Sequence, residues 1–145
     1  MANFVCEVLL TEAKLEPPKE SADVESGAVL DFWGIVRRLE DGHEIDGIDY
    51  ETNRSMAEHQ FELIAKAAAE KFRLNRVIGH HRIGFVSAGE ASLWLQVAAG
   101  HRAAAFEASK WIVDELKQKV PIWKRPRLRS SSGVASPHLQ EAIRK

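Results

Sequence analysis

The order of the elements that the sequence predicts indicates an α+β fold. Short runs rich in β-branched and aromatic residues are interspersed with two long stretches of helical periodicity, without the steady strand–helix alternation of a doubly wound sheet. The chain has 145 residues, of which 45% are hydrophobic and 28% charged. This composition suits one globular domain and excludes a disordered chain, a collagen-like repeat and a disulfide-stapled miniprotein.

The first third of the chain predicts strands joined by polar turns. One strand covers residues 4–11, and a second covers residues 27–36. The loop LEDGHE contains Asp-Gly, a strong turn signal, so we expect the alternating segment 45–52 to pair with the strand at 27–36 as a hairpin. Residues 17–25 are predicted to form a short acidic helix. Its two prolines lie near the start, where the N–H group that proline lacks would have no partner within the helix.

Two amphipathic helices are predicted further on. The first covers residues 55–72, with Ser55 and Glu58 as a capping box. The second runs from about His101 to Lys119 and ends there because Pro121 disfavours helical geometry in the residue before it. The inward faces are predicted to consist of Ala57, Phe61, Ile64, Ala65, Ala68 and Phe72 in the first helix, and Ala105, Ala108, Ile112 and Leu116 in the second.

The remaining segments are strand-like or flexible. The runs LNRVIGHHRIG and ASLWLQVAAG read as strands joined by the turn-prone FVSAGE, and PIWKRPRLR reads as an extended basic segment. We take residues 1–129 as the domain and residues 130–145 as a C-terminal tail. Within this tail, SPHLQEAIRK is expected to form a short helix capped by Ser136.

The charges are strongly segregated along the chain. The formal net charge is −1, yet residues 1–62 carry −10 and residues 63–145 carry +9. Such asymmetry indicates an anion-binding site or a charged partner. The basic excess is densest in residues 110–129, where Lys117 ends the second helix and Lys124 follows an apolar extended segment. Lysines at helix ends are often dipole partners or solvated surface, but Lys124 is better placed to point into a cleft.

A second candidate anion site lies at the start of the second predicted helix. His101 and Arg102 follow a strand that ends at Gly100, so free backbone N–H groups and a guanidinium meet there. A capping function for this pair is an equally good interpretation from position alone. Arg37, at the end of the strand over 27–36, could add charge to the same site or could simply be solvated.

Several classes of function find no support in the sequence. The single cysteine, Cys6, lies in an alternating apolar stretch and is best explained as a buried small hydrophobe. His80 and His81 are neighbours on a strand and point to opposite faces, so they cannot easily share a metal ion. We expect no metal, no cofactor and, since no signal peptide or membrane span is recognisable, a soluble cytoplasmic protein.

Four separated motifs resemble one family. GAVLDFWGIVR (27–37), HHRIG (80–84), HRAAAFEASKWIVDELK (101–117) and PIWKR (121–125) have the order and spacing of the large, catalytic subunit of molybdopterin synthase. The resemblance covers about residues 3–125. It implies an α/β hammerhead fold with a small additional antiparallel β subdomain, and a homodimer to which small ubiquitin-like sulfur-carrier subunits bind to give a heterotetramer.

The resemblance also implies an activity and a set of site residues. The carrier's C-terminal thiocarboxylate would enter a pocket and give sulfur to precursor Z, a cyclic pyranopterin monophosphate, to make molybdopterin. Carried over to this sequence, the catalytic lysines are Lys117 and Lys124. The substrate-binding residues are Arg37, His101, Arg102 and the aromatic Phe32. The tail at 130–145 would close over or near the pocket.

The chain departs from the family pattern at a few positions. An acidic residue usually follows Trp-Lys-Arg, where this chain has Pro126, and an aromatic is common near Asn53. Two alternative functions follow. One is an inactive homodimeric scaffold of the same fold that binds a ubiquitin-like tail. The other treats WKRPRLR as a nucleic-acid arm, although its basic run is short and no recognition-helix pattern accompanies it; we expect neither nucleic-acid nor membrane binding.

Overall fold

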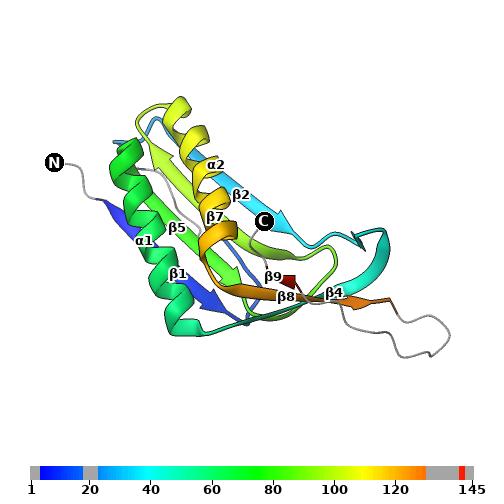
Figure 1. Ribbon diagram of the computed structural model, residues 1–145. Coiled ribbons are helices and arrows are strands. Elements are labelled where there is room, and N and C mark those ends of the chain that lie inside the picture. Colours follow the sequence, from blue (N-terminus) through cyan, green and yellow to red (C-terminus); the bar gives the residue numbers. More distant parts are fainter. Residues whose placement is uncertain (1–3, 18–22, 130–140, 143–145) are drawn as a thin grey trace.

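The computed structural model describes residues 4–17, 23–129 and 141–142, and in this part of the chain two helices lie on one face of a four-stranded sheet. A second sheet, built around a long strand, adjoins one end of the first (Figure 1). The predicted α+β class is confirmed. None of the helices in the described residues is long and apolar enough to cross a membrane.

The first sheet has the order β1-β5-β7-β2. Its strands are β1 (Val5–Thr11), β5 (Leu74–Arg82), β7 (Ala91–Ala99) and β2 (Ala28–Ile35). β1 runs parallel to β5, whereas β5 and β2 are both antiparallel to the central β7. Each of these strands was predicted to within two residues at either end. The run predicted over 74–84 ends as β5 at Arg82, and its last residue, Gly84, begins the next strand.

The helices cover one face of this sheet with the predicted residues. α1 spans Arg54–Phe72 and α2 spans Arg102–Lys119, and the two pack side by side (Figure 1). Their buried faces contain nine of the predicted apolar residues, with Phe72 partly buried. Small alanines dominate these faces, which lets the helices approach each other and the sheet closely.

The predicted capping box at the start of α1 is wrong. The N-cap is Asn53, whose side-chain oxygen accepts a hydrogen bond from the backbone N–H of Met56 at 3.1 Å. Ser55 already lies inside the first turn and donates its hydroxyl to that same Asn53 oxygen at 3.1 Å. The helix therefore begins one residue earlier than the sequence pattern indicated, because asparagine is as good a cap as serine.

The second sheet is organised around β4 (His43–Thr52), which is flanked by β8 (Ile122–Leu128) on one side. On its other side β4 pairs with β3 (Leu39–Glu40) and β6 (Gly84–Ser87). The expected hairpin between the strand at 27–36 and that at 45–52 is therefore wrong. The reason is that β2 pairs along its length with β7 and leaves the first sheet before the chain reverses.

The reversal occurs in a two-residue turn between β3 and β4. Asp41 and Gly42 both have positive φ, 51° and 81°, which is the conformation of a type I′ hairpin turn. What the sequence indicated as a loop over LEDGHE is thus mostly strand, with Glu40 opposite His43. Similarly, the predicted turn FVSAGE contains β6, and the chain reverses only around Gly89, whose φ is 93°.

Opposite charges from the two ends of the chain meet across β4 and β8. Three arginines of the basic segment pair with acids of the N-terminal half: Arg125 with Glu51 at 2.7 Å, Arg127 with Asp49 at 2.6 Å and Arg129 with Glu44 at 2.9 Å. Pairing of β4 with β8 therefore explains a good part of the charge segregation in the sequence. Only the remaining cations are candidates for an anion site.

Only part of each of two further predicted helices, at 17–25 and in the tail, lies within the described residues. For the helix at 17–25, residues 18–22 are not described, and Val24 and Glu25 lie in a turn where the Asp23 carboxylate accepts the N–H groups of Glu25 and Ser26. In the tail, β9 (Glu141–Ala142) pairs with Trp123 and Lys124 of β8. At those two positions the predicted terminal helix is wrong, since an extended segment hydrogen-bonds to the free edge of β8.

Candidate active site

A cavity of about 400 Å³ lies where the two sheets meet the C-terminal end of α2. Its wall has both apolar and polar surface and combines residues from both sheets and from both helices. The aliphatic and aromatic lining consists of Phe32, Ile35, Val36, Ile48, Tyr50, Phe61, Leu93, Val113, Leu116, Val120 and Ile122. Apolar surface beside a charged group reduces its contact with water and strengthens its interactions.

Four of the six predicted site residues line this cavity. Phe32 comes from β2, Arg37 from the segment just after β2, Lys117 from the last turn of α2 and Lys124 from β8. Arg37, Lys117 and Phe32 are exposed at its mouth, and Lys124 is partly buried. Three cations thus converge on one pocket, which suits a small ligand with an anionic end.

Lys124 is held by a carboxylate inside the cavity. Its Nζ lies 2.8 Å from Oε2 of Glu40, and the two side chains are 22% and 10% exposed. Across the β4–β8 ladder, Lys124 stands opposite Tyr50. The Tyr50 side chain is buried; burial raises the pKa of its hydroxyl, and a hydrogen bond with Ser92 acts in the opposite direction.

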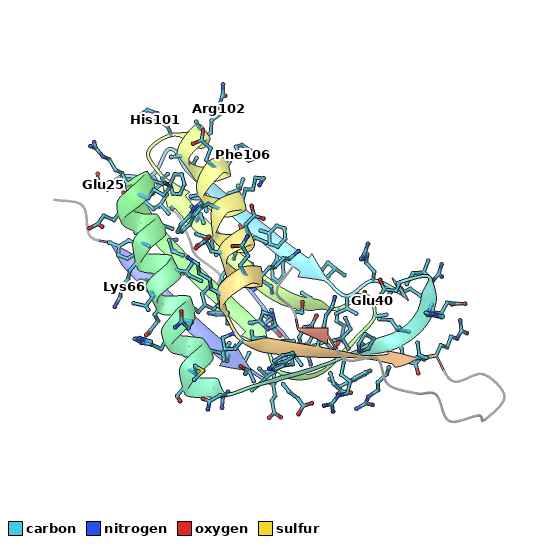
Figure 2. The ribbon with its side chains drawn as sticks, viewed as in Figure 1. Glu25, Glu40, Lys66, His101, Arg102 and Phe106 are labelled. Carbon is cyan, nitrogen blue, oxygen red and sulfur yellow. The ribbon has the colours of Figure 1, made fainter. Side chains whose placement is uncertain are left out.

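His101 and Arg102 do not reach this cavity. His101 is the N-cap of α2, without a side-chain capping bond, and Arg102 is the first residue of the helix. Fifteen residues of α-helix separate Arg102 from Lys117, a distance of roughly 22 Å along the axis. Figure 2 shows the pair at one extremity of the molecule and Glu40 toward the other. Both residues are exposed to solvent in the single chain.

His81 contributes a neutral polar group to the pocket wall. Its Nδ1 lies 2.7 Å from the carbonyl oxygen of Arg82, which can only accept, so Nδ1 carries the proton and Nε2 keeps a lone pair. Its ring packs edge-on against Tyr50 with centroids 5.2 Å apart. Burial lowers the pKa of His81 from 6.5 to about 4, although the bond to Arg82 opposes this shift.

The depressed pKa of His81 predicts an acid-sensitive stability. Because the unfolded chain binds a proton at His81 more readily than the folded chain, the free energy of unfolding should fall as the pH drops from about 6.5 to about 4. The loss expected from this residue approaches about 3 kcal/mol. Urea denaturation at a series of pH values measures it, and the His81→Gln variant should show a flatter dependence between pH 6.5 and pH 5.

A surface histidine provides the matched control for this measurement. His59 lies exposed on α1, and His59→Gln should retain the pH dependence of the wild type. Equal slopes for the wild type and His81→Gln would contradict the assignment. His80, the neighbour of His81, points to the other face of the sheet, where its Nε2 lies 2.6 Å from Glu7. The predicted separation of the two histidines is thus confirmed.

The polar pocket residues Glu40, Tyr50, His81 and Ser92 were not among the predicted site residues. A hairpin signal at Asp41-Gly42 was visible in the sequence, but the contact of Glu40 with Lys124 joins residues 84 positions apart. Among the described residues no group of His, Cys, Asp or Glu is arranged to hold a metal ion. Cys6 is only partly buried, packs against the core, and has a thiol pKa raised mainly by burial.

The fold and the pocket together define an α+β protein in which three cationic side chains, those of Arg37, Lys117 and Lys124, line one cavity. Comparison with known proteins identifies the family. Residues 10–119 match the model of the family described as MoaE protein. The chain is 38% identical over 109 residues to the molybdopterin synthase catalytic subunit of Thermoplasma volcanium, covering 75% of this chain and 80% of that protein.

Other relatives extend the comparison. The human molybdopterin synthase catalytic subunit is 36% identical over 106 residues, which are 73% of this chain but only 56% of the human protein. The crystal structure of molybdopterin synthase from Staphylococcus aureus matches with a TM-score of 0.74 at 24% identity, covering 97% of this chain and 98% of that one, which shows the shared fold. The chain therefore belongs to the MoaE family, the family of the molybdopterin synthase catalytic subunits.

Proposed function

We propose that this chain transfers sulfur from the C-terminal thiocarboxylate of a small ubiquitin-like carrier to precursor Z, and so builds the dithiolene of molybdopterin. The observation that carries the proposal is the convergence of Arg37, Lys117 and Lys124 on a single cavity. A carrier tail ending in a thiocarboxylate is a narrow anion, and precursor Z carries a phosphate. A pocket that is cationic at its mouth and partly apolar inside fits both ligands.

The chain itself is poorly equipped to supply sulfur. Cys6, the single cysteine of the sequence, lies on β1 and is not among the residues that line the cavity. Burial also raises the pKa of its thiol, which disfavours the nucleophilic thiolate. The sulfur atom must therefore arrive on a second molecule. A complex of subunits 1 and 2 of molybdopterin-converting factor from Helicobacter pylori matches this fold with a TM-score of 0.62, which supports such a partner.

Within the cavity we assign the lysines different tasks. Lys117 contacts the thiocarboxylate and stabilises the negative charge that develops on it during transfer. Lys124 acts as a second electrostatic clamp or as a proton donor, and Arg37 with Phe32 binds the pterin phosphate and ring. The exposure of Lys117 at the mouth and the partial burial of Lys124 support this division.

His101 and Arg102 can serve the same site only from a second copy of the chain. They lie a helix length away from Lys117 in their own chain, and both are exposed. In a homodimer with two-fold symmetry, each chain can present this end of α2 to the cavity of its partner. We therefore propose a homodimer in which the anion-binding pair reaches the substrate phosphate across the interface.

The finer architecture is also part of the proposal. The sheet of β1, β5, β7 and β2 with its two helices corresponds to the α/β hammerhead core, and the strands around β4 correspond to the small additional antiparallel subdomain. The pairing of Glu141–Ala142 with Trp123 and Lys124 supports a tail that lies near the pocket. The domain limits at 1–129 and 130–145, and a cytoplasmic location, stay predictions.

A single-turnover assay tests the function. The purified chain is mixed with thiocarboxylated carrier and precursor Z, and the dithiolene is measured after conversion to a fluorescent derivative. We expect stoichiometric product. An inactive scaffold of the same fold would bind the carrier and make no dithiolene, which would contradict the proposal. Salt-dependent affinity for DNA or RNA would instead favour the nucleic-acid interpretation of the basic segment.

A further inference from the structure

The ion pair between Glu40 and Lys124 joins residues that are 84 positions apart in the sequence and lie on β3 and β8, the two strands on either side of β4. Glu40 is the last residue of β3, directly before the Asp41-Gly42 turn, and Lys124 lies in the middle of β8. Their side chains meet at 2.8 Å in the wall of the cavity, and both are mostly buried. Figure 2 labels Glu40 at the inner side of the hairpin end of the molecule.

We propose that Glu40 is a positioning residue that fixes the ammonium group of Lys124 in the cavity wall and leaves Lys117 as the lysine available to an incoming anion. The proposal rests on the proposed function for the tasks of the two lysines. The ion pair itself does not depend on it. Glu40 acts through Lys124 and contacts neither the carrier nor precursor Z.

The geometry of the hairpin explains why Glu40 can do this. Asp41 and Gly42 form a two-residue type I′ turn, which joins β3 to β4 directly and sets Glu40 opposite His43. The carboxylate is therefore presented from a fixed point, while Lys124 alone would have a long flexible side chain with several rotamers. A charge-assisted hydrogen bond in a half-buried site selects one of them. Removing the carboxylate would leave a partly desolvated ammonium without a counter-ion, and the side chain would turn toward water.

No neighbour on β8 can replace Glu40. The side chains of alternate residues share a face, so the next inward position after Lys124 is occupied by Pro126, which is buried and has no carboxylate. Arg125 and Arg127, on the other face, pair with acids of β4. In this chain the anion that accompanies Lys124 is therefore supplied by the β3–β4 hairpin.

Lys117 differs from Lys124 in this respect. Within the described residues it has no carboxylate within 4 Å, although it lines the same cavity and is exposed at its mouth. Its neighbour in the last turn of α2, Lys119, is paired with Glu115 at 2.7 Å and does not line the cavity. An anion entering the pocket thus meets Lys117 without having to displace an internal partner.

Amine reactivity tests the proposal without any substrate. The wild type and Glu40→Gln are labelled with a limiting amount of a small acetylating reagent, and each lysine is quantified by peptide mass spectrometry. We expect Lys124 to react more slowly than Lys117 in the wild type. In Glu40→Gln the reactivity of Lys124 relative to Lys117 should rise about tenfold, the effect of losing a charge-assisted hydrogen bond. An unchanged ratio overturns the proposal.

Turnover distinguishes positioning from structural support. Glu40→Gln should lower kcat about tenfold and leave KM for the carrier within about twofold, since the clamp on the reacting group is lost and the wider surface that binds the carrier is unchanged. Glu40→Asp, which keeps the charge, should recover part of the lost kcat. The matched control is Glu44→Gln, in the same hairpin, whose carboxylate pairs with Arg129 at the surface. A loss of the same size in Glu44→Gln contradicts the proposal.

A measurement on the wild-type protein avoids the possibility that a variant misfolds. In ¹H–¹⁵N spectra of lysine ammonium groups, assigned with Lys124→Arg, the signal of Lys124 should persist through slow proton exchange, and the signal of Lys117 should be broadened. A missing Lys124 signal overturns the proposal. Failure of the proposed function looks different: no dithiolene would form in any variant, while the labelling and the spectra would still show Lys124 held by Glu40.

Discussion

Replacing Lys117 with alanine should reduce dithiolene formation by about two to three orders of magnitude and leave carrier binding nearly unchanged. The reduction follows from the loss of the exposed cation at the mouth of the cavity, where charge develops on the thiocarboxylate. Carrier affinity depends on the wider surface around the tail and should change by less than about threefold. Single-turnover product analysis and calorimetric titration of the carrier measure the two quantities separately.

Lys119 provides a matched control on the same helical turn. It is exposed, is paired with Glu115 and does not line the cavity. Lys119→Ala removes the same charge from the same end of α2, so it should keep product formation within about twofold of the wild type. Product formation by Lys117→Ala at the wild-type rate would exclude Lys117 from the reaction.

The second large effect is expected from dimers with one altered residue in each chain. Arg102→Ala should lower activity about a hundredfold in the homodimer, because a bidentate contact with the substrate phosphate is lost. A purified mixed dimer, with Lys117→Ala in one chain and Arg102→Ala in the other, should recover about half of the wild-type activity. One of its two cavities then combines an intact Lys117 with an intact Arg102 from the partner.

The recovery depends on the separation of the two ends of α2. If each chain used its own Arg102, both cavities of the mixed dimer would be damaged, and activity would stay as low as in the parent variants. A mixed dimer of Lys117→Ala and Lys124→Ala serves as the control. Both residues line the same cavity of one chain, so neither cavity is intact and no recovery is expected.

The sequence predicted most of the first sheet and both helices because their signals are local. Helical periodicity in α1 and α2 and the apolar runs of β2 and β7 can be recognised within windows of a dozen residues. The pairing of the strands was harder to predict from the sequence. β4 pairs with β8, more than seventy residues away, and no local pattern distinguishes that partner from β2.

The candidate site shows the same limit. The cationic residues Arg37, Lys117 and Lys124 were identified by type and by motif, and the structure brings them to one cavity. Glu40 was not predicted as a site residue because an acidic residue beside a turn is usually solvated. Its contact with Lys124 follows only from the pairing of β4 with β8. His81 was not predicted as a site residue because its lowered pKa results from burial, and the sequence does not show which histidines of a strand are buried.

The ion pairs across β4 and β8 cannot by themselves determine how these strands align. Arg125 stands opposite Asp49 in the ladder yet bonds to Glu51, and Arg127 bonds to Asp49, so a slip of two residues would still set arginines beside acids. The inner face opposes that slip, because a slip in one direction would put the charged Lys124 in the buried place of Pro126, opposite Ile48, and a slip in the other would put Pro126 in the place of Lys124, opposite Tyr50. The buried proline therefore helps to fix the position of Lys124, and the alignment of β4 with β8 determines which side chain of β8 faces Glu40.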